Sequence, residues 1–244
     1  MRVLLLVMLL LSPWLAAADN AQAYKLFELA GINVLCEQSA PLAQKGLSED
    51  LQKRVAAAFS AQGLCDELAQ RLATKLTPEQ FKEALALLQT PLAQGFTAAE
   101  RAVGESEDGS QGLAAYRQQL KERPPLPARL QLVQRLDAAS HTTDLATLLR
   151  YEAGKTQAWL SLQQRGQSID EQALSAQTTR QAEELRSSSA QAVESFMLYA
   201  YRQMPSDQLT QYAELYEQPA VSLLMSSSLQ LLPQLFAQRR AKLK

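Results

Sequence analysis

Apolar residues recur at helical spacing along most of the chain, and this pattern predicts an all-α protein. Leu64, Leu68 and Leu72, for example, are spaced by four. Residues three or four apart lie on one side of a helix, so they mark a face that can be buried. We expect about ten helices, with kinks at prolines. The expected segments are 21–37, 48–61, 64–76, 77–103, 113–122, 128–139, 143–153, 155–165, 168–204, 204–219 and 220–243.

One helical signal occurs twice, in residues 76–91 and 204–219, at a constant offset of 128 residues. In the first copy Thr77 can cap the helix, Pro78 suits the first helical position and Gln80 completes a capping box. In both copies a later proline interrupts the helix, because its ring removes a backbone donor. The identical pairs are Gln80/Gln208, Leu87/Leu215 and Pro91/Pro219.

The repeat predicts two similar helical modules with proline-kinked segments in matching places. We expect a signal peptide at 1–18, the first module at 19–123, a Pro-rich linker at 124–127 and the second module at 128–244. The linker is Pro124-Pro125-Leu126-Pro127, which favours a stiff, extended chain. The alternative is that two unrelated helix–proline–helix segments look alike in a leucine-rich chain.

Helix breakers set the other expected boundaries. Residues 38–47 contain Pro41 and Gly46 and are expected to form a loop, and residues 104–109 are expected to form an acidic loop. The glycines expected to end helices are Gly63, Gly154 and Gly166.

The second copy reads Met204-Pro205-Ser206-Asp207-Gln208-Leu209, followed by Leu215-Tyr216-Glu217-Gln218-Pro219. These residues resemble a family of exported bacterial helical proteins known as "domain of unknown function 2059". The family motif has an aromatic pair, one further residue and Ser-Pro-x-Gly after a capped helix start. Tyr216 keeps the second aromatic, and Thr90-Pro91 in the first copy is close to Ser-Pro. The resemblance implies an all-α exported protein in two tandem copies, and no established activity comes with it.

Composition agrees with the helical pattern and excludes some partners. The chain has 44 Leu against 8 Val and 2 Ile, and strands prefer the β-branched residues that are scarce here. The net charge is −1 and the pI is about 6.0. A nearly neutral chain lacks the basic footprint of a nucleic-acid binder, so we expect no nucleic-acid partner.

The amino terminus has the three parts of a secretory signal. Arg2 supplies the positive charge, residues 3–11 are apolar, and small residues precede a cleavage site after Ala18. The apolar run is shorter than the ~20 residues that cross a bilayer, so we expect no transmembrane segment in the mature chain. The predicted location is periplasmic or secreted. An uncleaved anchor is the alternative.

Two cysteines, Cys36 and Cys65, lie 29 residues apart. In an oxidising compartment a single pair at this separation predicts one disulfide, which would tie the first expected helix to the third. The alternative is a pair of buried free thiols.

The sequence offers no established catalytic or metal-binding pattern, so we expect no cofactor and no metal site. His141 is the one histidine, and the glycine spacing of residues 104–110 lacks the lysine of a phosphate loop. The basic end at residues 239–244 suits the negative end of a helix. Contact with anionic lipid is the second interpretation of that segment.

Aromatic residues concentrate in the second module and suggest a groove. The candidate groove residues are Phe196, Tyr199, Tyr212 and Tyr216. From these patterns we expect an exported, non-enzymatic binding or protein-interaction module, whose partner is a periplasmic protein or an apolar ligand. The alternatives are an envelope-acting enzyme with a dispersed carboxylate site and a carrier of a small apolar ligand.

Overall fold

The computed structural model describes residues 13–104 and 107–243. Within these residues the chain forms twelve helices and no strand, which confirms the all-α prediction. The helices are α1 (Pro13–Leu29), α2 (Ile32–Gln44), α3 (Glu49–Ala58), α4 (Ala61–Leu72), α5 (Pro78–Leu88), α6 (Pro91–Gly104), α7 (Glu107–Glu122), α8 (Pro127–Ser140), α9 (Thr142–Gln164), α10 (Glu171–Ala200), α11 (Ser206–Tyr216) and α12 (Pro219–Ala241).

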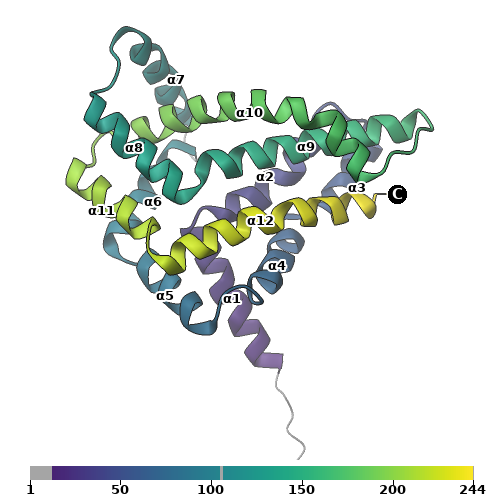
Figure 1. Ribbon diagram of the computed structural model, residues 1–244, viewed down its shortest axis with the longest axis horizontal. Helices are drawn as coiled ribbons and strands as arrows, with labels where there is room; N and C mark the ends of the chain where they lie inside the picture. Colours follow the sequence, from purple (N-terminus) through teal and green to yellow (C-terminus); the bar gives the residue numbers. More distant parts are fainter. Residues whose placement is uncertain (1–12, 105–106, 244) are drawn as a thin grey trace, which may run out of the picture.

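Helices from both halves of the sequence surround α12, which crosses the middle of the molecule (Figure 1). It packs on α4 and α5 from the first half and on α9 from the second, and α2 packs on α9. The buried apolar residues of all these helices form one cluster. The Pro-rich segment joins α7 to α8 and therefore divides the sequence, whereas the hydrophobic core is shared.

The two similar segments have the same local structure. Residues 73–91 and 201–219 share every helix, turn and bend position, so α5 and α11 begin and end at matching residues. The closing hydrogen bonds also match, since Gln89 N donates to Leu85 O (2.9 Å) and Glu217 N to Ala213 O (3.1 Å). The repeated prolines begin α6 and α12 instead of kinking a helix. Proline fits there because the first helical position needs no backbone donor.

The two copies also contact each other reciprocally. Helix α5 of the first copy packs on α12 of the second, and α11 of the second packs on α6 of the first. The preceding helices repeat the pattern, because α4 packs on α12 and α10 packs on α6. Likewise, α1 contacts α4 and α5, and α8 contacts α10 and α11. The fold therefore has a pseudo-two-fold arrangement that relates α1, α4, α5 and α6 to α8, α10, α11 and α12.

Several predicted boundaries were wrong. Residues 21–37 form parts of two helices, because Gly31 adopts a left-handed conformation (φ 72°) between α1 and α2. Helix α2 then continues through Pro41, because Ser39 and Ala43 bury their side chains and this packing offsets the missing backbone donor. Gly63 and Gly154 lie inside α4 and α9. Of the predicted acidic loop, Gly104 belongs to α6 and residues 107–109 belong to α7, and residues 105–106 lie outside the described residues.

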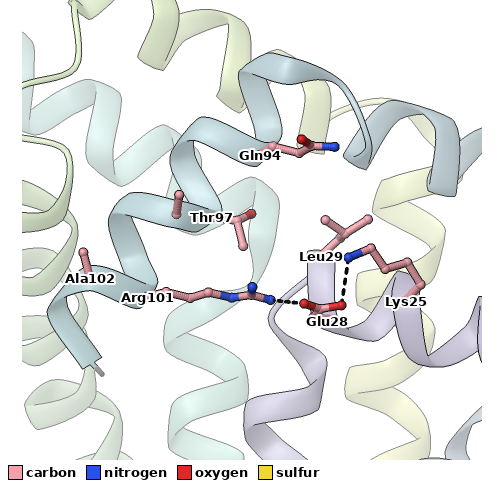
Figure 2. A pocket seen from close by; sticks show the side chains of 8 residues that line it. Lys25, Glu28, Leu29, Gln94, Thr97, Arg101 and Ala102 are labelled. Atoms are coloured by element: carbon pink, nitrogen blue, oxygen red, sulfur yellow. Dashed lines mark hydrogen bonds and ion pairs between the residues drawn. The ribbon is translucent and has the colours of Figure 1, made fainter. Parts of the chain in front are cut away.

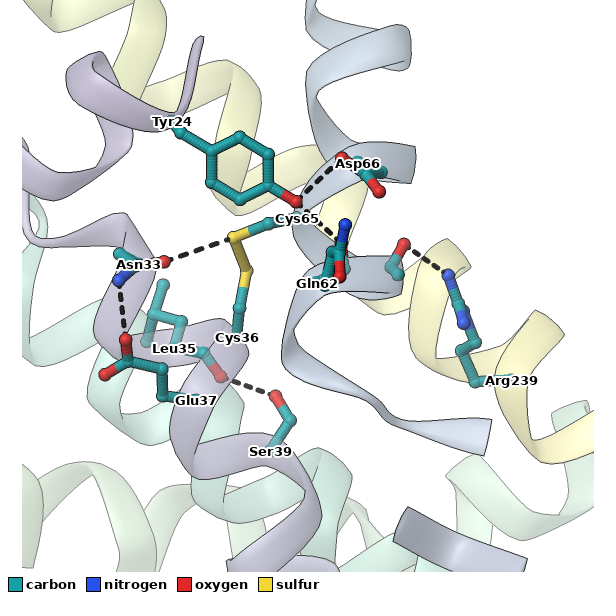
Figure 3. The surroundings of a disulfide bond; sticks show 11 residues. Tyr24, Asn33, Leu35, Cys36, Glu37, Ser39, Gln62, Cys65, Asp66 and Arg239 are labelled. Carbon is teal, nitrogen blue, oxygen red and sulfur yellow. Dashed lines mark hydrogen bonds between the residues drawn. A yellow bond between two sulfur atoms is a disulfide. The ribbon is translucent and has the colours of Figure 1, made fainter. Parts of the chain in front are cut away.

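The predicted cysteine pair lies between α2 and α4 (Figure 3). The Sγ atoms of Cys36 and Cys65 are 2.12 Å apart, at bonding distance, and each residue is only 1% exposed. Beside them the Tyr24 hydroxyl donates to Asp66 Oδ1 (2.7 Å). The pair therefore joins the second and fourth helices, because the predicted first helix is divided at Gly31.

The two arginines of the basic end lie in the last turn of α12, as expected for the negative end of a helix, and both are buried, whereas Lys242 is exposed. Arg240 Nη1 contacts Glu152 Oε2 (2.6 Å) and Arg240 Nη2 contacts Glu171 Oε1 (2.6 Å). Lys155 Nζ also reaches Glu171 Oε1 (2.6 Å), so two cations meet two carboxylates among α9, α10 and α12. Burial alone would raise the pKa of Glu171, but hydrogen bonds from Arg240 and Lys155 outweigh it and lower the pKa.

Among the described residues, α12 is the one helix long and apolar enough to span a membrane. In this structure it is the central helix of the core, and it carries the buried Arg240. Of its most apolar stretch, 56% is buried. Most of the predicted signal peptide, residues 1–12, lies outside the described residues, so its cleavage stays a prediction.

Candidate functional site

Helix α6 presents two polar sets of side chains on different faces. One face meets α1 and lines a cavity of about 490 Å³. The other face meets α10 and α11. We call the cavity the α1/α6 pocket, and its lining residues are Lys25, Glu28, Leu29, Gln94, Thr97, Ala98, Arg101 and Ala102.

A three-residue charge cluster spans the α1/α6 pocket. Figure 2 shows the Glu28 carboxylate between Arg101 of α6 and Lys25 of its own helix. Lys25 Nζ lies 3.0 Å from Glu28 Oε2, and Arg101 donates to Glu28 Oε1. Hydrogen bonds from Arg101 and then Lys25 lower the pKa of Glu28, so this carboxylate is charged at neutral pH. Two cations share one anion, which leaves an excess of one positive charge.

The floor of the pocket is small and apolar apart from one hydroxyl. Leu29 and Thr97 are buried, and Ala98 and Ala102 leave room above the helix backbone. In the part of the chain that the structure describes, Thr97 Oγ1 is buried and has no hydrogen-bond partner. A buried hydroxyl without a partner costs free energy. The pocket therefore combines excess positive charge at its rim with apolar lining residues such as Leu29, Ala98 and Ala102.

On the opposite face of α6, Glu100 meets three tyrosines, which we call the Glu100–tyrosine cluster. The Tyr201 hydroxyl donates to Glu100 Oε1, and the hydroxyls of Tyr212 and Tyr216 lie 3.4 Å apart. The ring of Phe96 stacks on Tyr212 with centroids 4.2 Å apart. Burial raises the pKa of the Glu100 carboxyl to about 7, and it also raises the pKa of all three tyrosines.

The corresponding contact of the other repeat forms without such a polar cluster. At the offset of 128 residues, Ser228 corresponds to Glu100, and Ala73 corresponds to Tyr201. The positions of Tyr212 and Tyr216 are occupied by Ala84 and Leu88 in the other copy. These counterparts pack α12 against α5 with small or apolar side chains, of which Ala84, Leu88 and Ser228 are buried. The Glu100–tyrosine cluster is therefore specific to the α6–α11 contact.

Replacing Glu100 with glutamine is expected to stabilise the protein at alkaline pH. The folded state favours a protonated Glu100 up to about pH 7, whereas the unfolded chain releases that proton near pH 4.5. The stability from this proton is complete below the lower value and is lost as the pH rises to the higher one. Glu100→Gln keeps an acceptor for Tyr201 and stays neutral. We expect the free energy of unfolding of this variant to exceed that of wild type by about 1–3 kcal/mol at pH 8.

Urea denaturation of both proteins at pH 5 and pH 8 measures this difference. Groups other than Glu100 titrate in both proteins, so the comparison between variants cancels them. The charged and titratable groups near Glu100 are Arg101, Tyr201, Tyr212 and Tyr216. An equal stability difference at the two pH values would contradict the argument.

The structure distributes the four residues of the predicted groove over two places. Tyr212 and Tyr216 are buried in the Glu100–tyrosine cluster, where they serve the core instead of an open groove. Tyr199 contacts Tyr116 of α7, with ring centroids 5.5 Å apart, and Phe196 is half-buried on the same helix as Tyr199. The aromatic residues of the sequence could not show which neighbouring helices would cover their side chains.

Sequence analysis did not identify Glu28, Thr97, Glu100 or Arg101. Charged residues on an amphipathic helix usually face water, so their identity alone gives no signal. Alignment of the two copies does give a signal, because Glu100 is aligned with Ser228. His141 forms the turn between α8 and α9, with Nδ1 3.2 Å from Asp144 Oδ2. The described residues include no group of three or more metal-ligating side chains.

Comparison with known proteins gives no relative for this chain. It matches no protein-family model, no curated protein and no solved structure.

Proposed function

We propose that this chain is an exported, non-enzymatic binding module whose α1/α6 pocket receives a carboxylate of a partner protein. The observation that carries the proposal is the meeting of Lys25 and Arg101 at one carboxylate, Glu28. An arginine fork and an ammonium group favour carboxylates. The pocket volume of about 490 Å³ lies in the range of small-ligand sites.

The site has the chemistry of recognition. Its one carboxylate, Glu28, is held charged by two cations, and a general acid would need a raised pKa instead. The second cavity that we describe below also has one acidic lining residue, Asp207. Both cavities open to the surface and have polar rims, which favours a partner's side chains over an enclosed apolar cargo.

The extracytoplasmic location is part of the proposal. The signal pattern at residues 1–18 and the cysteine pair at bonding distance both support it, because structural disulfides persist in oxidising compartments. Membership of the exported helical family, suggested by residues 204–219, also stays a proposal.

Short peptides test the site. The probes are Ac-Ala-Ala-Ala with a free carboxyl terminus, Ac-Ala-Glu-Ala-amide and Ac-Ala-Gln-Ala-amide. We expect one of the two carboxylate peptides to bind at least about tenfold more tightly than the glutamine peptide by calorimetry. The peptide that binds more tightly shows whether the pocket prefers a terminal or a side-chain carboxylate. Binding should weaken with salt, because surface charges are screened.

Two variants and a matched control locate the binding. Ala98 is an exposed lining residue, so Ala98→Trp should fill the pocket and abolish binding, and Arg101→Gln should remove the charge that selects a carboxylate. Ala114 is an exposed alanine of α7, so Ala114→Trp should bind as wild type does. Equal affinity for all three peptides, or unchanged binding by Ala98→Trp, would overturn the proposal.

A further inference from the structure

The reciprocal contacts of the two copies differ most in side-chain size at one lining position, where one copy has a glycine and the other a leucine. The α6–α11 contact contains a cavity of about 440 Å³, which we call the Gly95 pocket. Its α6 wall is mainly apolar and its α11 wall is polar. The lining residues are Pro91, Leu92, Gly95, Phe96, Met204, Asp207, Gln208 and Gln211. The equivalent positions in the α12–α5 contact are Pro219, Ala220, Leu223, Leu224, Leu76, Glu79, Gln80 and Glu83.

Gly95 stands where the other copy has Leu223. Leu223 is half-buried and packs against the core, whereas a Cβ built on Gly95 would meet nothing within 4 Å. Leu92 is larger than its counterpart Ala220, yet the space over Gly95 stays open.

Glycine inside a helix lowers stability unless the backbone needs it. Gly95 is not among the glycines with positive φ, and no neighbouring atom approaches closely enough to exclude a side chain. Neither structural reason for glycine applies here. Gly95 therefore leaves open space where the other copy holds a leucine side chain.

The chain itself presents a matching leucine. Among the described residues the exposed large apolar side chains are Val34 and Leu126, at 54% and 77% exposure. Leu126 belongs to the Pro-rich segment and has extended backbone angles (φ −59°, ψ 135°). Flanking prolines hold the segment in this conformation before it binds, which reduces the entropy lost on docking.

The charge beside Leu126 and its position in the molecule also match the Gly95 pocket. Arg123 is exposed at the start of the Pro-rich segment, and Asp207 is the charged residue of the Gly95 pocket. Arg129, in the first turn of α8, donates to Ser206 Oγ (3.3 Å), which is next to Asp207 in sequence. The leucine and the pocket therefore lie on the same side of the molecule. Two copies related by a two-fold axis can exchange both contacts, as isologous dimers do.

We propose that a second copy of this chain inserts Leu126 into the Gly95 pocket, with Arg123 of that copy near Asp207. Exchange of this contact in both directions gives a weak, reversible dimer. The proposal is independent of the α1/α6 pocket, which shares no lining residue with the Gly95 pocket.

Sedimentation equilibrium between about 1 µM and 1 mM tests the dimer. Wild type is expected to shift from monomer toward dimer with concentration. Gly95→Leu fills the pocket as the duplicate does, so it should remain monomeric at every concentration with a melting temperature no lower than that of wild type. Leu126→Ser should also remain monomeric. Val34→Ser removes the other exposed apolar residue and should associate as wild type does.

A cross-link gives a second readout. When Gly95→Cys and Leu126→Cys proteins carrying different tags are mixed and oxidised, a heterodimer linked through the two new cysteines is expected. A wild-type protein that stays monomeric throughout the range would overturn the proposal. So would association of Gly95→Leu equal to that of wild type, since this would place the contact elsewhere or assign it to Val34.

Discussion

Replacing Arg240 with methionine is expected to lower the free energy of unfolding by about 3–5 kcal/mol. Arg240 and Glu152 each expose only 2% of their side chains, and their contact is 2.6 Å. Methionine fills much of the same volume but leaves Glu152 buried with Lys155 alone, 3.5 Å away. The loss comes from an uncompensated buried charge, because a well-paired buried ion pair itself adds little net stability.

Urea denaturation followed by far-UV circular dichroism measures the loss. Arg180→Met is the matched control, because Arg180 is exposed on α10 and its replacement should change stability by about 0.5 kcal/mol or less. The double variant Arg240→Met/Glu152→Gln should recover part of the loss, because it removes the orphaned charge as well. If Arg240→Met is as stable as Arg180→Met, the contacts of Arg240 with Glu152 and Glu171 do not stabilise the packing of α12.

The local parts of this fold could be predicted because short-range bonds create them. Thr77 and Gln80 form both bonds of the capping box, with Thr77 N donating to Gln80 Oε1 (2.8 Å) and Gln80 N to Thr77 Oγ1 (3.2 Å). All the atoms that decide this helix start lie within four residues. The duplicated proline segments were recognised for the same reason.

Glycine positions could not be interpreted from sequence in the same way. Gly31 ends α1 with a positive φ, whereas Gly154 lies inside the continuous helix α9. Glycine permits both conformations, so the surroundings decide between them. Around Gly154, buried Ala153 and Thr156 hold α9 in the core, and this tertiary packing outweighs the intrinsic preference of glycine.

The polar sites depend on long-range contacts and were therefore missed. Arg240 is 88 residues from Glu152 and 69 residues from Glu171. A basic pair near a chain end suits the negative end of a helix, and both arginines lie in the last turn of α12, but this pattern gives no sign of the buried carboxylates that Arg240 meets. Glu100 meets Tyr201 across 101 residues, and only the packing of α6 against the end of α10 brings them together.

The cysteine pair is expected to stabilise the fold nearly as much as the Arg240 network. The bond closes a loop of 29 residues and joins α2 to α4. Loop closure restricts the unfolded chain, so Cys36→Ala/Cys65→Ala should lower the free energy of unfolding by about 3–4 kcal/mol. Alanine is the appropriate replacement, because both sites are buried and a serine hydroxyl would have to be satisfied there.

A reducing agent separates the loss of the bond from the loss of side-chain volume. Reduced wild type should lose most of that stability, whereas the stability of the alanine variant should be the same with and without reductant. Thiol titration of unfolded, unreduced wild type should find no free thiol, because the two Sγ atoms lie at bonding distance. Two titratable thiols, or a wild-type unfolding midpoint that does not respond to reductant, would show that Cys36 and Cys65 pack together as thiols. The pair would then stabilise α2 against α4 only through their buried contact.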